Sequence, residues 1–141
     1  MGIDQSTWDF FQKHIGYSDE EMETFRENPR NVDVISKAPD LMNKSIVIEV
    51  VESHGCNSRH QAGDKFHFDG AGNLITKLNP KRICIYALSS MASLIFSSNE
   101  LFYAGVDPNE MRFKRAGCFD VGLQCGGWGR IVMEISMGER R

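Results

Sequence analysis

The sequence of 141 residues has no apolar run that approaches the roughly 18 residues a transmembrane helix needs. Its first residues also lack the basic-then-apolar order that is typical of a secretory signal peptide. These two absences predict a cytoplasmic protein without a membrane partner. In a reducing cytoplasm the four cysteines are expected to be thiols, metal ligands or core residues rather than disulfides.

An excess of basic charge is missing as well, because the formal net charge is −3. Broad nucleic-acid binding requires a basic surface, so no nucleic-acid partner is expected. Acidic residues are concentrated in residues 1–42, which hold nine acidic and four basic side chains. Aromatic and aliphatic residues interrupt these acids, which favours the solvated face of packed helices over an acidic tail.

Signals for two or three short amphipathic helices are present in residues 1–42. Gly16 is expected to end the first helix, since glycine adopts the left-handed conformation of a helix C-terminus. Ser18 and Glu21 have the spacing of a capping box, which predicts that a second helix begins there. A third helix is expected over residues 31–38, ending before Pro39.

Residues 43–141 combine strand patterns with one long helix pattern, which Asn79-Pro80 is expected to begin and which runs to about Ser98. The strands are separated by turns or by a single helix, not by regular βα repeats, and this order favours the α+β class. We therefore expect a mostly antiparallel sheet of about four to five strands packed on one long helix, with short N-terminal helices, together one domain. The expected strands lie near residues 46–51, 65–68, 74–75, 111–115 and 131–137.

Cys56 and His60 lie in one short polar loop that also contains His54. Thiolate and imidazole are the usual protein ligands of zinc and related metals. The same pair has the chemistry of a nucleophile and its base, because a nearby imidazole lowers the pKa of a thiol. A surface loop with a partly buried cysteine explains these residues equally well.

Cys118 and Cys125 form a second group, in a glycine-rich segment that spans residues 117–129. Their spacing is not a CxxC motif, and the segment contains no phosphate-binding GxxxxGK[ST] motif. A glycine-rich loop lets backbone N–H groups approach a ligand, and Gly126 and Gly127 are the candidates for that role. The alternative is a wide hairpin connection that uses glycine only to turn.

Cys84 falls on the apolar face expected for the long helix, and core packing is the favoured interpretation of its thiol. Lys81 and Arg82 lie near the expected start of that helix, where the helix dipole disfavours basic side chains. Such a pair is consistent with anion binding, although solvated charges explain it as well.

The stretch from Cys56 to Cys125 resembles a family of small, functionally uncharacterised bacterial and archaeal proteins that is common in anaerobes. The shared pattern is Cys56, the run from His60 to Phe66 (HQAGDKF), a cysteine that opens the helix, here Cys84, and a late cysteine, here Cys118. This sequence has isoleucine after the helix cysteine where the pattern has proline, and a longer connection to the late cysteine. The resemblance implies a small α+β fold and implies that Cys56 and His60 act as a pair.

Three functional hypotheses follow. In the first, Cys56, His60, Cys118 and Cys125 bind a metal cofactor, zinc or iron, which requires two loops far apart in sequence to meet at one end of the sheet. In the second, Cys56 or Cys118 is the catalytic nucleophile of a thiol-dependent enzyme and His60 is its base.

In that second hypothesis the amides of Gly126 and Gly127 stabilise an oxyanion. The third hypothesis is a non-enzymatic accessory subunit whose acidic helical segment docks on a protein partner. The small size of the chain and its many N-terminal aromatic residues are also compatible with a homodimer. No residue pattern selects a substrate, so the small-molecule or protein partner is left open.

Overall fold

The computed structural model describes residues 2–140. The chain divides into two compact units, residues 1–40 and 41–141. This division lies two residues before the boundary expected from the sequence, which placed the α+β core at residues 43–141.

Three helices begin the chain, and the two local capping signals among them are confirmed. Gly16 follows α1 in the left-handed conformation, with φ of 83°. The Ser18 hydroxyl accepts a hydrogen bond from the Glu21 amide, and the Glu21 carboxylate accepts one from the Ser18 amide, which completes the capping box of α2. The helices are α1 (Gln5–Ile15), α2 (Asp19–Arg26) and α3 (Pro29–Met42).

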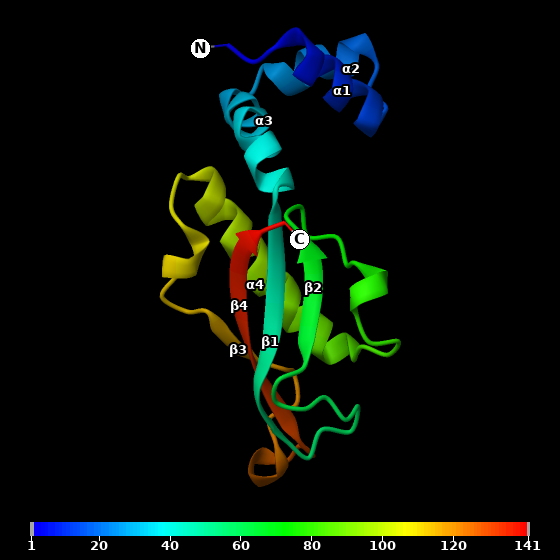
Figure 1. Cartoon of the computed structure of the whole chain (residues 1–141), viewed down its shortest axis with the longest axis vertical. Helices are drawn as coiled ribbons and strands as arrows, with labels where there is room; N and C mark the ends of the chain where they lie inside the picture. The colour runs from blue at the N-terminus through cyan, green and yellow to red at the C-terminus, as the bar shows by residue number, and fades with distance from the viewer. Residues whose placement is uncertain (1, 141) are drawn as a thin grey trace. The chain divides into compact units, whose positions relative to one another are not determined.

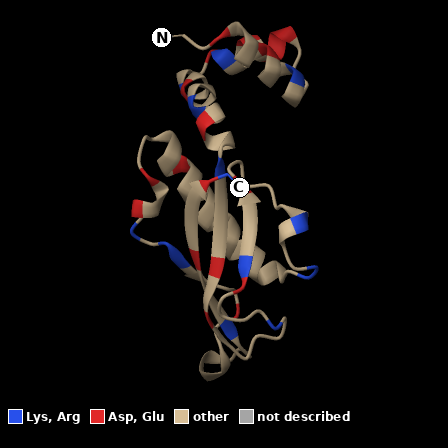
Figure 2. Cartoon of the chain, viewed as in Figure 1, with Lys and Arg blue, Asp and Glu red and all other residues tan. Residues whose placement is uncertain are grey.

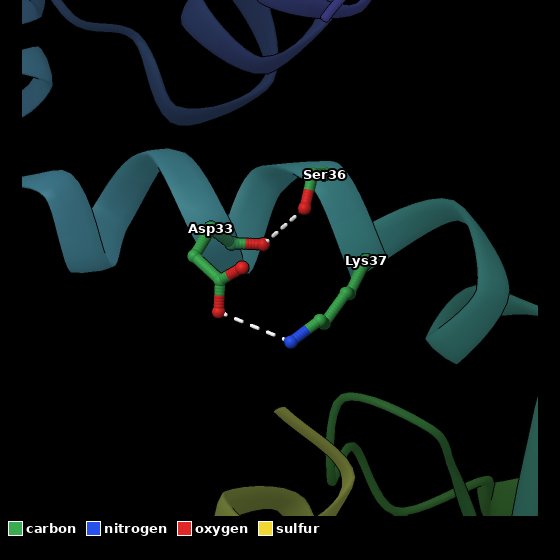
Figure 3. A network of polar contacts seen from close by, with 3 residues as sticks. All are labelled: Asp33, Ser36 and Lys37. Carbon is green, nitrogen blue, oxygen red and sulfur yellow. Dashed lines mark hydrogen bonds and ion pairs between the residues drawn. The ribbon is translucent and has the colours of Figure 1, made fainter. Parts of the chain in front are cut away.

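The expected end of the third helix before Pro39 is wrong, because α3 begins at Pro29 and continues through Pro39 to Met42. Proline at the first position suits a helix, whereas Pro39 removes a backbone hydrogen bond. Leu41, two residues later, is only 3% exposed, and its burial favours the last turn. On the exposed side of α3 the Asp33 carboxylate pairs with the Lys37 ammonium at 3.1 Å, and the Ser36 hydroxyl donates to the Asp33 carbonyl (Figure 3).

The N-terminal unit has its own small apolar core of Trp8, Met22 and Ile35. Phe11, Tyr17, Phe25, Val32 and Ile3 pack around these three side chains. Acidic residues crowd the first turn of α2, as Figure 2 shows in red. The expectation of packed amphipathic helices with a solvated acidic face is therefore confirmed.

The larger unit is an α+β fold built on a four-stranded antiparallel sheet with the strand order β2-β1-β4-β3. The fifth strand is not formed, since Leu74 makes only an isolated bridge to Phe68. The strand expected over residues 111–115 is displaced to a short β3. The strands are β1 (Lys44–His54), β2 (Lys65–Asp69), β3 (Arg115–Gly117) and β4 (Arg130–Glu139).

The helix α4 (Ile85–Tyr103) packs on one face of this sheet (Figure 1). Alternate residues of β1 and β4 are buried against this helix. The fully buried ones include Ile46, Ile48, Val50 and Met133. Because successive side chains of a strand point to opposite faces, burial alternates along both strands. Three short 3₁₀ helices, η1 (Thr76–Leu78), η2 (Pro108–Glu110) and η3 (Leu123–Cys125), lie in the connections.

The start of α4 corrects the sequence interpretation, because the helix begins at Ile85 and not at Asn79-Pro80. The Asn79 side chain instead accepts a hydrogen bond from the His67 amide at 2.8 Å and donates to the His67 and Ile75 carbonyls. It satisfies backbone groups of the edge strand β2 and is not available to cap a helix. Residues 79–84 are therefore irregular, and Cys84 becomes the residue immediately before the helix.

Candidate functional site

Four chain segments meet at one end of the sheet (Figure 1). There β1 ends at His54, directly opposite Arg130, where β4 begins. The Gly117 carbonyl, at the end of β3, accepts a hydrogen bond from the Ser90 hydroxyl in the first part of α4, at 2.6 Å. The loop after β1, the loop after β3 and the start of α4 are therefore neighbours.

The two predicted loops come together closely at Gly55 and Gly129. A side chain on Gly129 would overlap the Gly55 carbonyl group, so the two backbones are in direct contact. Gly55 itself has φ of 67°, a conformation that glycine adopts without strain. The meeting of the Cys56 loop with the glycine-rich segment, which the metal hypothesis requires, is thus present.

All four cysteines lie in segments at this end of the fold, and three of them are half-buried. Cys56 follows β1 by two residues, Cys118 follows β3 directly, and Cys84 precedes α4 directly. All three are half-buried and pack against the main apolar core. Cys125, in η3 of the loop after β3, is exposed instead.

A metal centre built from these residues was the first hypothesis. Within residues 2–140, no group of three or more His, Cys, Asp or Glu side chains is placed to hold a metal ion. The predicted zinc or iron ligands Cys56, His60, Cys118 and Cys125 therefore stay a prediction.

His60 is buried, with 4% of its surface exposed, and its ring meets Phe66 edge-on. Its Nε2 atom accepts a hydrogen bond from the backbone N–H of Cys84 at 3.2 Å. Burial lowers the pKa of His60, and the nearby Asp64 carboxylate only partly opposes that shift. A neutral imidazole that accepts at Nε2 carries its proton on Nδ1. Since the Nε2 lone pair is occupied, His60 is not free to act as a base through that nitrogen.

The loop around His60 is held by further hydrogen bonds. The Ser53 hydroxyl donates to the His60 carbonyl at 2.6 Å, and the Gly63 amide donates to the Val50 carbonyl at 2.8 Å. Arg59 has a positive φ of 61°, which is uncommon for a residue with a side chain. These two bonds fasten the loop to β1, and the contact of His60 with the Cys84 amide fastens it to the start of α4.

The surroundings of Cys84 favour its thiolate form. Burial by itself raises the pKa of its thiol, but contacts with the Ala87 backbone, the Ser58 side chain and the Tyr86 backbone outweigh burial and leave the pKa lowered. The Cys84 side chain itself forms no capping hydrogen bond with the first turn of the helix. The first N–H groups of a helix carry partial positive charge, which stabilises an anion there.

An open pocket of about 440 Å³ adjoins this thiol. Its walls come from the loop after β1 and from the irregular segment before α4, and Cys84 is the only cysteine among its lining residues. They are Asn57, Ser58, Lys81, Arg82, Ile83 and Cys84.

The glycine-rich segment is organised by Asp120. Its carboxylate accepts hydrogen bonds from the amides of Gly122, Trp128 and Gly129. These bonds hold the pKa of Asp120 below its usual value, because they favour the charged carboxylate. They account for a folded connection in a segment with few apolar contacts.

Gly126 and Gly127, the predicted ligand-binding residues, use their amides inside that connection. The Gly127 amide donates to the Gly122 carbonyl at 2.8 Å, and the Gly126 amide donates to the Leu123 carbonyl at 3.3 Å. Neither amide is available to an oxyanion in this conformation. The structure thus supports the turn-forming interpretation of the glycines.

Sequence reasoning placed Cys84 in the core and missed its position before the helix. The resemblance contained the signal, since its pattern has a cysteine that opens the helix. Asn57 and Ser58 gave no signal of their own, because short polar residues are common in any loop.

No helix within residues 2–140 combines the length and the apolar character needed to cross a membrane. The family resemblance that the sequence suggested remains an expectation. Comparison of the chain with protein-family models, with curated proteins and with solved structures gives no match.

Proposed function

We propose that this protein is a thiol-dependent enzyme in which Cys84 supplies the reacting thiol and a small molecule occupies the adjoining pocket. The observation that carries the proposal is the position of Cys84, directly before α4 and on the wall of that pocket. A helix N-terminus lowers the pKa of a cysteine, and the thiolate is the nucleophilic form. The nucleophile is thus reassigned from Cys56 or Cys118 to Cys84.

His60 and Ser58 support the thiol in different ways. His60 is a positioning residue, because its bond to the Cys84 amide fastens the loop to the helix start. Ser58, two residues earlier in the same loop, faces the thiol and favours its ionised form. The loop therefore brings a hydroxyl to the thiol, while a buried neutral histidine holds the loop in place.

The proposal is tested by the relative reactivity of the four cysteines in the folded protein. A limiting amount of iodoacetamide is added at neutral pH, and peptide mass spectrometry measures the labelled fraction at each position. Although Cys84 is half-buried, we expect it to be labelled at least as fast as the exposed Cys125. A Cys84 that is labelled only after unfolding would contradict the proposal.

A metal-binding protein is the second candidate. It is favoured by the position of three half-buried cysteines, Cys56, Cys84 and Cys118, at the same end of the fold. Elemental analysis of protein purified without added metal or chelator decides this point. Near-stoichiometric zinc or iron that disappears in Cys56→Ser supports the metal site, and a metal-free protein removes this candidate.

A further inference from the structure

Lys81 and Arg82 lie side by side in the irregular segment before α4, and both are exposed. Among the interactions of residues 2–140, neither side chain forms an ion pair with an acidic residue. Two basic side chains beside a helix N-terminus repel each other and are repelled by the positive end of the helix dipole. Within the described residues, no ion pair therefore offsets the positive charge at this point.

Lys81 and Arg82 both line the pocket beside Cys84. Two of its six lining side chains are cations, and Asn57 and Ser58 add an amide and a hydroxyl that donate hydrogen bonds. None of the six is acidic, and Ile83 is the only aliphatic residue. Cations and neutral donors without a carboxylate form the lining that a bound anion requires.

We propose that this pocket binds the negatively charged group of a small substrate, a carboxylate or a phosphate, between Lys81 and Arg82 and next to the Cys84 thiol. The inference rests on the proposed function of Cys84 and adds the substrate class to it. The anion offsets the cations and the helix dipole, and it holds the rest of the substrate against the thiol. The pocket is open, so small anions in solution can reach it.

The first test reads anion binding without any reaction of the thiol. Inorganic phosphate is titrated into the ¹⁵N-labelled protein at constant ionic strength, and NMR follows the backbone amides of residues 81–86. We expect saturable shifts in the wild type and their loss in the double variant Lys81→Gln/Arg82→Gln. A second double variant, Lys13→Gln/Arg30→Gln, loses the same charge from the other unit and should keep the shifts. Acetate in place of phosphate shows whether a carboxylate is also accepted.

The second test measures whether the Cys84 thiol reacts faster with an anionic reagent than with a cationic one. Methanethiosulfonates react when a thiolate attacks the sulfenyl sulfur, so that a new disulfide forms and methanesulfinate leaves. The anionic sulfonatoethyl reagent is compared with the cationic trimethylammonioethyl reagent, and each rate at Cys84 is divided by the rate at Cys125 in the same molecule. We expect Cys84 to favour the anionic reagent by about tenfold at low salt, and less as the salt concentration rises.

The two proposals fail in different ways. An unreactive Cys84 in a protein that still binds phosphate overturns the proposed function and leaves the anion site in place. A reactive Cys84 without saturable phosphate shifts and without a preference for the anionic reagent overturns the anion site alone. A charge preference that persists in Lys81→Gln/Arg82→Gln also contradicts the assignment to these two residues.

Discussion

The imidazole Nε2 of His60 accepts a hydrogen bond from the backbone N–H of Cys84, across a distance of 3.2 Å and 24 positions of the sequence. This bond joins the loop after β1 to the residue that begins α4. It satisfies an amide at the start of the helix and fixes the imidazole in one tautomer. Through the same loop it brings Ser58 to the Cys84 thiol.

Replacing His60 tests how much this bond contributes to the fold. His60→Ala leaves a cavity beside Phe66 and an unsatisfied amide at Cys84, so we expect the free energy of unfolding to fall by about 2–4 kcal/mol. Urea denaturation followed by circular dichroism measures the change. The control is His54→Ala, which replaces an exposed histidine at the end of β1, and its stability should stay within about 0.5 kcal/mol of the wild type. Equal effects of the two variants would contradict the buried role of His60.

The lowered pKa of His60 makes stability depend on pH in a defined direction. The unfolded chain takes up the proton near pH 6.5, whereas the folded chain takes it up only at a lower pH. The unfolded state therefore binds more protons in this interval, and stability falls as the pH decreases from 6.5 toward the folded pKa. Urea midpoints of the wild type and His60→Asn are compared between pH 8 and pH 5, and only the wild type should show this loss. The Asp64 carboxylate, which faces the imidazole, is retained in both proteins.

The contact between Gly129 and Gly55 predicts that a single methyl group disrupts the site. Gly129→Ala forces the added carbon against the Gly55 carbonyl, and we expect a loss of about 1–3 kcal/mol of stability from overpacking. Thermal denaturation measures this loss. Gly138→Ala is the matched control, because an added carbon at Gly138 in β4 meets nothing within 4 Å. If both variants melt at the wild-type temperature, the two loops are not in contact.

The hydrogen bonds of Asn79 predict that its replacement destabilises the edge of the sheet and not the helix. Asn79→Ala removes three hydrogen bonds, two to His67 and one to Ile75, and should cost about 1–3 kcal/mol. Hydrogen exchange of the His67 amide should accelerate, while the amides of α4 remain protected. Asn43→Ala, at an exposed turn residue, is the control. Faster exchange at the start of α4 instead would mean that Asn79 caps the helix, as its sequence pattern suggested.

The sequence predicted the features that depend on neighbouring residues. The capping box at Ser18 and the left-handed Gly16 were found because each is completed within a few positions. The strands near residues 46–51 and 131–137 were found because apolar residues there supply the buried faces of β1 and β4. The α+β class followed from the order of these elements.

Other features depend on contacts between distant residues, and the sequence did not reveal them. Asn79-Pro80 has the pattern of a helix start, but a strand 12 positions earlier binds the Asn79 side chain. Because the helix begins at Ile85 and not at Asn79, Cys84 lies immediately before the helix and not within it. The buried His60 likewise has its partner 24 positions away, so its role as an anchor could not be distinguished from that of a ligand or a base.

The central claim is that the surroundings of Cys84 stabilise its thiolate, and the pH dependence of its alkylation tests this directly. The rate of iodoacetamide labelling at Cys84 is measured against pH in the folded protein and again in the protein unfolded by urea. The midpoint of the curve reports the ionisation of the thiol, whereas the absolute rate also depends on access. The account predicts a lower midpoint in the folded protein than in the unfolded one. A folded midpoint equal to or above the unfolded midpoint would contradict it.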